Sequence, residues 1–222
     1  LVEAFDAGAD DYIIKPFTAK VLQARISSGE RLIRSQQTIS NDREMIRRYA
    51  AKLAAANRKL QNMAMTDFLT GLPNRRSALH RLKNLVAEVQ RYGEPLSCLM
   101  LDIDHFKQIN DTHGHDCGDA VLRQLAKLLE EKARSYDMVS RWGGEEFLIV
   151  SARSGGPDTC QLAERLRKNV ENREFPLADD LKIKLTISIG VATWSSDLRH
   201  AEELITHADQ ALYQAKANGR NR

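Results

Sequence analysis

The chain has 222 residues, a formal net charge of +3 and a hydrophobic content of 42%. This length is enough for one good-sized core with something extra. The mild charge, with basic residues interspersed among acids, argues against nucleic-acid binding as a main function. No apolar run approaches the ~20 residues of a membrane span. We therefore expect a soluble protein that binds neither nucleic acid nor membrane.

Cys98, Cys117 and Cys160 are scattered and lack metal-ligand spacing. Free thiols in a reducing cytoplasm explain them most simply, so we expect a cytoplasmic protein. There is no secretory signal pattern. The first residue is Leu rather than Met, from which we expect a fragment of a longer chain.

Residues 1–17 are typical of the end of another domain. Asp10 to Phe17 is a short β-type run that contains Lys15-Pro16. The run resembles the last strand of a response-regulator receiver domain. That resemblance implies that Lys15 contacts a phosphoryl group and that a receiver and its kinase act upstream. An ordinary strand and turn is the alternative.

Residues 18–64 contain no proline and one glycine, and they are rich in helix-forming residues. Apolar residues recur at intervals of seven at Leu32, Ile39, Ile46, Leu53 and Leu60. Such a narrow stripe over about four heptads favours a coiled coil, hence a homodimer, and a tetramer stays open. The alternative is an amphipathic helix that packs on its own domain.

From residue 65 to 222, β-type and helical patterns alternate, which predicts an α/β or α+β domain. Leu181 to Thr193 alternates as one strand, and Asp119 has the position of a helix N-cap. Lys216 and Arg220 lie at the end of the closing helix, where cations are favourable in any protein.

Two acidic clusters stand out in this region. An apolar run, predicted as a buried strand, ends in Asp102-Ile103-Asp104, and Gly143-Gly144 between two β-type runs predicts a tight hairpin with Glu145 and Glu146 at its mouth. If strand and hairpin are neighbours, Asp102, Glu145 and Glu146 supply hard oxygen ligands that suit Mg²⁺, with Mn²⁺ as an alternative. The simpler interpretation is a solvated turn with two surface glutamates.

Gly143 to Phe147 resembles the signature of the GGDEF-domain diguanylate cyclases, in its Glu-for-Asp form. The resemblance covers roughly Thr66 to Arg222. Asp67, Leu69 to Leu72 and Asn74 to Arg76 match the family's entry segment, and Tyr213 to Asn221 matches its closing motif. It implies a palm-like fold similar to adenylyl cyclase, with a mostly antiparallel sheet.

The resemblance also assigns residues to roles. It implies Glu145 as the catalytic residue, and Asp102, the carbonyl of Ile103, Glu145 and Glu146 as metal ligands. It places guanine against Asn110, His115, Asp119 and Leu122, and phosphates against Lys107, Lys216 and Arg220. It implies an inhibitory site for product at Arg134, Asp137 and Arg165.

The implied reaction joins two GTP molecules into cyclic di-GMP with release of two pyrophosphates. It depends on Mg²⁺, needs a dimer because each domain holds one GTP, and is inhibited by its product. One alternative is a catalytically silent module that acts as a cyclic di-GMP receptor. Two further alternatives are a related cyclase that accepts more than one kind of nucleotide and a coiled-coil signalling adaptor without enzymatic activity.

Overall fold

The computed structural model describes residues 5–6, 8–9, 11–63, 65–177 and 181–222. The chain divides into two compact units, Leu1–Lys59 and Leu60–Arg222. The predicted domain limits at residues 17 and 64 stay a prediction. Within the described ranges, no helix combines the length and the apolar character that crossing a bilayer requires.

The first unit is dominated by one long helix, α2 (Ala19–Met63). Leu32, Ile39, Ile46 and Leu53 are exposed along it, whereas the side chain of Leu60 lies outside the described residues. An exposed apolar stripe at heptad spacing is the surface that a partner helix would bury. The coiled coil therefore stays a prediction.

The run that precedes α2 is not a strand. Residues 11–14 have no regular secondary structure, the Lys15–Pro16 peptide bond is cis, and Asp10 lies outside the described residues. A strand needs a partner for its backbone groups, and among the described residues none pairs with this run. The assignment of residues 1–17 to the end of a receiver domain stays a prediction.

The second unit is built on a four-stranded antiparallel sheet in the order β2-β3-β1-β6. Its strands are β1 (Leu96–Ile103), β2 (Met138–Gly143), β3 (Glu146–Ala152) and β6 (Ile187–Thr193). A separate pair joins β4 (Phe175–Pro176) to β5 (Lys182–Ile183). The predicted α/β class with a mostly antiparallel sheet is confirmed.

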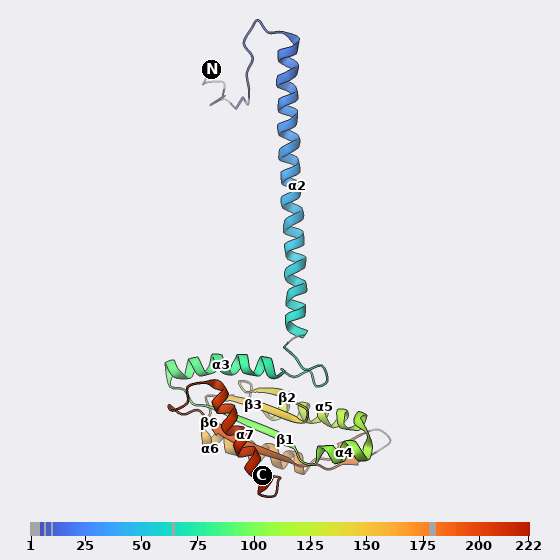
Figure 1. Ribbon diagram of the computed structural model, residues 1–222, viewed down its shortest axis with the longest axis vertical. Helices are drawn as coiled ribbons and strands as arrows, with labels where there is room; N and C mark the ends of the chain where they lie inside the picture. The colour runs from blue at the N-terminus through green and yellow to red at the C-terminus, as the bar shows by residue number, and fades with distance from the viewer. Residues whose placement is uncertain (1–4, 7, 10, 64, 178–180) are drawn as a thin grey trace. The chain divides into compact units, whose positions relative to one another are not determined.

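Helices cover both faces of this sheet (Figure 1). On one face, α5 (His115–Lys132) and α6 (Gly156–Glu171) pack against Leu99 and Leu101 of β1. On the other, α3 (Arg75–Tyr92) and α7 (Ala201–Ala217) pack against Cys98 and Met100. Successive residues of a strand point to opposite faces of the sheet. The side chains of the fully buried β1 therefore contribute to the hydrophobic cores on both faces.

Two local predictions were wrong. Residues 181–193 form β5 and β6 in different sheets, because Lys184–Thr186 leaves the strand path and Thr186 bonds to Asp104. Asp119 is not an N-cap, because α5 already begins at His115. Gly114, at φ 84°, is the one residue between α5 and the preceding α4 (Phe106–His113), and it adopts the backbone turn that other residues resist.

Candidate active site

The sheet brings the two acidic clusters together at one end. Asp102, near the end of β1, lies opposite Glu146, the first residue of β3, and opposite Ser188 on its other side. Asp102 is 7% exposed. Residues opposite each other in an antiparallel pair have Cβ atoms about 5 Å apart. The register therefore places both carboxylates in one small region.

The hairpin differs from its prediction by one residue. Gly143 still belongs to β2 and pairs with Glu146, after a register shift next to Arg141. The turn therefore consists of Gly144, at φ 49°, and Glu145. Glu145 thus lies in the turn itself, and Glu146 lies on the strand beside Asp102.

Arg141 ties this turn to the entry segment. Its Nε and Nη2 donate to the carbonyl of Gly144 at 3.0 and 2.8 Å, and its Nη1 donates to Asp67 Oδ1 at 3.0 Å. Burial alone would raise the pKa of Asp67, but hydrogen bonds from Thr70 and Arg141 hold that pKa below its usual value. A change in the conformation of the entry segment would therefore alter the position of the glycine turn through Arg141.

Lys216 of α7 supplies positive charge to the carboxylates. Its Nζ lies 2.8 Å from Asp102 Oδ2. Burial raises the pKa of Asp102 even so, and Glu145 and Asp104 add to the rise. Burial and the charge of Asp102 likewise raise the pKa of Glu146. Negative charge is thus crowded here, and the site favours additional cations.

Asp102, Glu146 and Glu145 do not stand in a ready-made metal arrangement. Among the described residues, no three His, Cys, Asp or Glu side chains form a group that could hold a metal ion. The ammonium of Lys216 instead provides the compensating charge at Asp102. The donors present, carboxylates and the backbone carbonyl of Ile103, are nonetheless the hard oxygen ligands that Mg²⁺ prefers, and they fit such an ion chemically.

A cavity of about 680 Å³ lies beside the glycine turn. It is bounded by the entry segment, by the hairpin and by Asp119 of α5. Its lining is Asp67, Phe68, Leu69, Asn74, Arg75, Arg76, Asp119, Arg141, Trp142, Gly143 and Gly144. Of the residues predicted to contact guanine, Asp119 is the one that lines it.

Asn110 of α4 carries an unused hydrogen-bond acceptor. Its Oδ1 is, among the described residues, the one buried side-chain oxygen or nitrogen without a hydrogen-bond partner. It lies where a Cβ at Gly118 would be, so only glycine there leaves room for it. A buried acceptor without a partner is costly, and a ligand that brings a donor would remove that cost.

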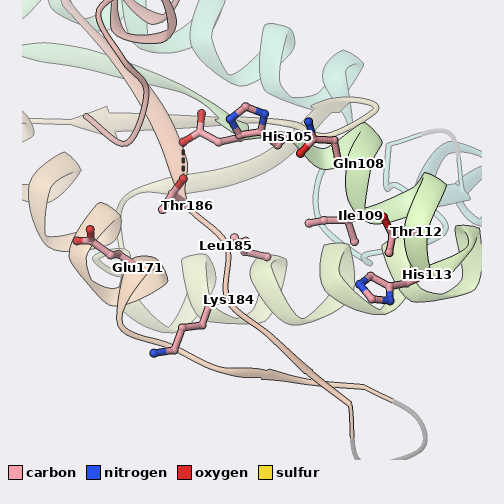
Figure 2. Close-up of a pocket in the computed structure, with 10 residues that line it drawn as sticks. His105, Gln108, Ile109, Thr112, His113, Glu171, Lys184, Leu185 and Thr186 are labelled. Carbon is pink, nitrogen blue, oxygen red and sulfur yellow. Dashed lines mark hydrogen bonds between the residues drawn. The ribbon is translucent and has the colours of Figure 1, made fainter.

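The other predicted substrate contacts are dispersed. Leu122 is 3% exposed and is part of the core between α5 and the sheet. Lys107, His115 and Arg220 are exposed, on α4, at the start of α5 and after α7. A second cavity, of about 500 Å³, lies between α4, the end of α6 and residues 184–186 (Figure 2), and none of the predicted site residues lines it.

The three residues predicted for the inhibitory site lie near the end of α5. Asp137 accepts the backbone N–H of Arg134 at 2.9 Å and the hydroxyl of Ser151 at 2.6 Å. The Arg134 guanidinium lies over the ring of Tyr136, and Arg165 Nη2 donates to the carbonyl of Lys132 at 3.2 Å. The loop thus has a defined shape, with both guanidinium groups beside it.

Three contacts were not anticipated from the sequence. Lys216 was expected to bind phosphate, but its ammonium contacts Asp102. Arg141, which contacts Asp67, was not singled out. Asp104 was not assigned a role, although it is only 5% exposed. A charged residue next to the glycines and a second acid at the strand end were the available signals. Neither feature indicates which residue Arg141 or Asp104 contacts, because the contacted residues lie far away in the sequence.

Known proteins resemble this chain over much of its length. Response regulator PleD of Caulobacter vibrioides is 36% identical over 222 residues, which is all of this chain and 46% of that protein. Diguanylate cyclase DosC of Escherichia coli is 44% identical over 156 residues, 70% of this chain and 34% of that protein. The chain thus spans less than half the length of these two relatives.

Solved structures agree in fold. The coiled coil and GGDEF domain of DgcB from Caulobacter crescentus, in complex with c-di-GMP, matches with a TM-score of 0.73 and 28% identity, covering 90% of this chain and 97% of that one. The active GGEEF domain of a diguanylate cyclase from Vibrio cholerae matches with a TM-score of 0.63 and 37% identity, over 67% of this chain and 94% of that one. A family model described as "Diguanylate cyclase, GGDEF domain" matches residues 64–222, and the chain belongs to this family.

Proposed function

We propose that this chain condenses two GTP molecules into cyclic di-GMP and releases two pyrophosphates. The observation that carries the proposal is the register of Asp102 opposite Glu146, with Glu145 in the adjoining turn. A chain that only bound cyclic di-GMP would not need acids crowded enough to raise the pKa values of Asp102 and Glu146. Membership of the family supports the same reaction.

In this proposal guanine is recognised by α4 and α5. The carboxylate of Asp119 accepts hydrogen bonds from ring N1–H and from the exocyclic amino group, and Asn110 Oδ1 gains the donor that it lacks in the structure. Adenine offers no N1–H. The pair therefore favours GTP over ATP.

The phosphates lie at the acidic end of the sheet. Asp102, Glu145, Glu146 and the Ile103 carbonyl would hold Mg²⁺, which when bound neutralises phosphate charge and promotes ionisation of the attacking hydroxyl. Lys107, Lys216 and Arg220 neutralise the triphosphate. Each 3′-oxygen forms a bond to the α-phosphorus of the other GTP as the bond to pyrophosphate breaks. Glu145, in the turn, is the residue that we propose takes the 3′-hydroxyl proton.

One domain holds one GTP, so two domains must face each other. The exposed heptad stripe of α2 supports dimerisation, which would raise the effective concentration of one half-site near the other. For feedback, Arg134 and Arg165 would bind a phosphate or stack on guanine, and Asp137 would accept from a guanine edge.

The test is GTP turnover by the purified chain with Mg²⁺, measured before and after removal of co-purified nucleotide. Cyclic di-GMP formation that rises after removal supports the cyclase and its product site together. No product in either state, at concentrations where the chain is dimeric, overturns the proposal in favour of a receptor.

The product site is tested separately with Arg134→Ala, which should keep the initial rate and lose inhibition by cyclic di-GMP. Arg91→Ala is the matched control, because Arg91 lies 5.3 Å from the ring centroid of Tyr92 much as Arg134 lies 5.9 Å from that of Tyr136. If Arg134→Ala is still inhibited like the control, the assignment of this site is wrong.

A further inference from the structure

A buried carboxylate holds three segments together beside the acidic end of the sheet. Asp104 accepts the hydroxyls of Thr186 at 2.7 Å and Ser188 at 2.6 Å, and the backbone N–H of Asn221 at 3.1 Å. It follows Asp102 and Ile103 directly. The end of β1, the start of β6 and the C-terminal residues are thus joined through one side chain.

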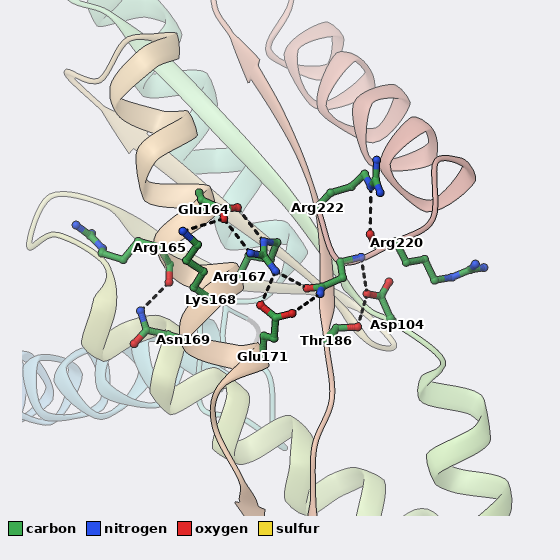
Figure 3. Close-up of polar contacts among 11 residues, drawn as sticks. Asp104, Glu164, Arg165, Arg167, Lys168, Asn169, Glu171, Thr186, Arg220 and Arg222 are labelled. Carbon is green, nitrogen blue, oxygen red and sulfur yellow. Dashed lines mark hydrogen bonds and ion pairs between the residues drawn. The ribbon is translucent and has the colours of Figure 1, made fainter.

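Two residues of α6 that Figure 3 labels, Arg167 and Glu171, hold the side chain of Asn221 from the other direction. Its Oδ1 accepts from Arg167 Nη1 at 2.7 Å, and its Nδ2 donates to Glu171 Oε1 at 2.7 Å. Arg167 is itself bound to Glu171 and, through two hydrogen bonds, to Glu164. The hydrogen bond from Arg167 lowers the pKa of Glu164 to about 2, as expected of a paired, ionised carboxylate.

The backbone at Arg220 and Asn221 has an unusual conformation. Arg220 and Asn221 have φ of 61° and 47°, a left-handed conformation that side chains with a Cβ rarely adopt. Ile189 N donates to the carbonyl of Arg222 at 2.8 Å, which holds the next residue against β6. Such a conformation persists only where its surroundings hold it, and the contacts of Asn221 and Arg222, the two residues that follow Arg220, do so.

We propose that Asn221, anchored by Arg167 and Asp104, is a positioning residue that aims Arg220 at the GTP triphosphate. The inference rests on the proposed function in one respect, namely that Arg220 contacts phosphate. Asn221 acts through Arg220 and does not touch the nucleotide. The hydrogen bond that Asn221 N–H donates to Asp104, and the one that Asn221 Oδ1 accepts from Arg167, keep Asn221 and the arginine before it in their left-handed conformation.

The first test is Asn221→Gly in the full chain, because glycine accepts the left-handed backbone and removes only the side-chain anchor. Equilibrium binding of GTP is measured in EDTA, where affinity for the phosphates depends on the cationic side chains and a metal-dependent reaction cannot proceed. GTP should bind about tenfold more weakly, as for the loss of a charge-assisted hydrogen bond. Guanosine, which has no phosphate, should bind as it does to the wild type.

Two further variants sharpen this test. Arg167→Ala should weaken GTP binding in the same way, whereas Lys168→Ala, which removes a neighbouring cation from Glu164 but no contact to Asn221, should not. In an Arg220→Ala background, Asn221→Gly should have little further effect, because residues that act through one another are not additive.

Wild-type GTP affinity in Asn221→Gly, equal losses for GTP and guanosine, or full additivity with Arg220→Ala would each overturn the inference. If the wild-type chain binds GTP but forms no cyclic di-GMP, the proposed function is contradicted and the role of Asn221 is not. That role is decided by the comparison of GTP and guanosine binding between Asn221→Gly and the wild type.

Discussion

Asp102 and Asp104 lie two residues apart on the same buried strand end, yet their surroundings differ. Asp104 accepts hydrogen bonds from Thr186, Ser188 and Asn221. Asp102 has the ammonium of Lys216, faces Glu146 across the sheet, and has a pKa raised by burial. A carboxylate that is fully hydrogen-bonded holds a structure together, whereas one that is buried among other acids is ready to bind a cation.

The same contrast appears between Asn221 and Asn110. Both polar atoms of the Asn221 amide have protein partners, and the oxygen of Asn110 has none among the described residues. Since unpaired buried polar groups cost free energy, their positions indicate where a ligand completes the structure. The difference separates the candidate site from the framework that supports it.

The largest effect should come from Asp102→Asn. The amide keeps the shape but removes the charge, so GTP turnover should fall by roughly 10²- to 10³-fold, as when a group that stabilises charge in the transition state is lost. The thermal midpoint should not fall, because a charge that is unfavourable in the folded state has been removed. Turnover within threefold of the wild type would make Asp102 a framework residue like Asp104.

Asp104→Ala should have the opposite profile. It leaves two hydroxyls and one backbone N–H near the C-terminal segment without their acceptor, so the free energy of unfolding should fall by about 3 kcal/mol. Urea denaturation followed by circular dichroism measures this loss. Asp158→Ala, an exposed acid in the first turn of α6, is the control and should change stability by well under half as much. Equal losses in both variants would contradict the framework role.

Gly118→Ala tests the acceptor on Asn110. The added Cβ would overlap Asn110 Oδ1 and displace the amide, so GTP affinity should fall about tenfold through loss of a hydrogen bond to the base. Ala120→Ser, a small change two residues further along α5, serves as the control. Comparison of GTP with inosine triphosphate, which lacks the exocyclic amino group, shows whether the lost contact is to that group. An equal loss for both nucleotides would place the Asn110 contact elsewhere.

The smallest effect concerns pH. The pKa values of Asp102 and Glu146 are raised, and a protonated carboxyl cannot bind a cation, so turnover should decline on acidification at a higher pH than an ordinary carboxyl would cause. Because the charge of Asp102 contributes to the rise at Glu146, Asp102→Asn should lower the pKa of Glu146. Carboxyl NMR titration of both proteins measures it, and an unchanged Glu146 would show that the two acids do not interact.

Patterns within short stretches were sufficient for much of this protein. The heptad spacing predicted a long helix where α2 lies, and the apolar run before Asp102 predicted β1. The order of the motifs between Asp67 and Asn221 identified the family. These features depend on periodicity and local chemistry, which neighbouring residues express regardless of the rest of the fold.

The tertiary structure decided which polar group has which partner. Arg167 meets Asn221, and Arg141 meets Asp67, across 54 and 74 residues of sequence. The strand order β2-β3-β1-β6 sets Glu146 and Ser188 on either side of Asp102, and the departure of residues 184–186 from the strand path brings Thr186 to Asp104. The letters Asp-Ile-Asp predict two acids, but only the packing of distant segments leaves one of them saturated and the other open to a cation.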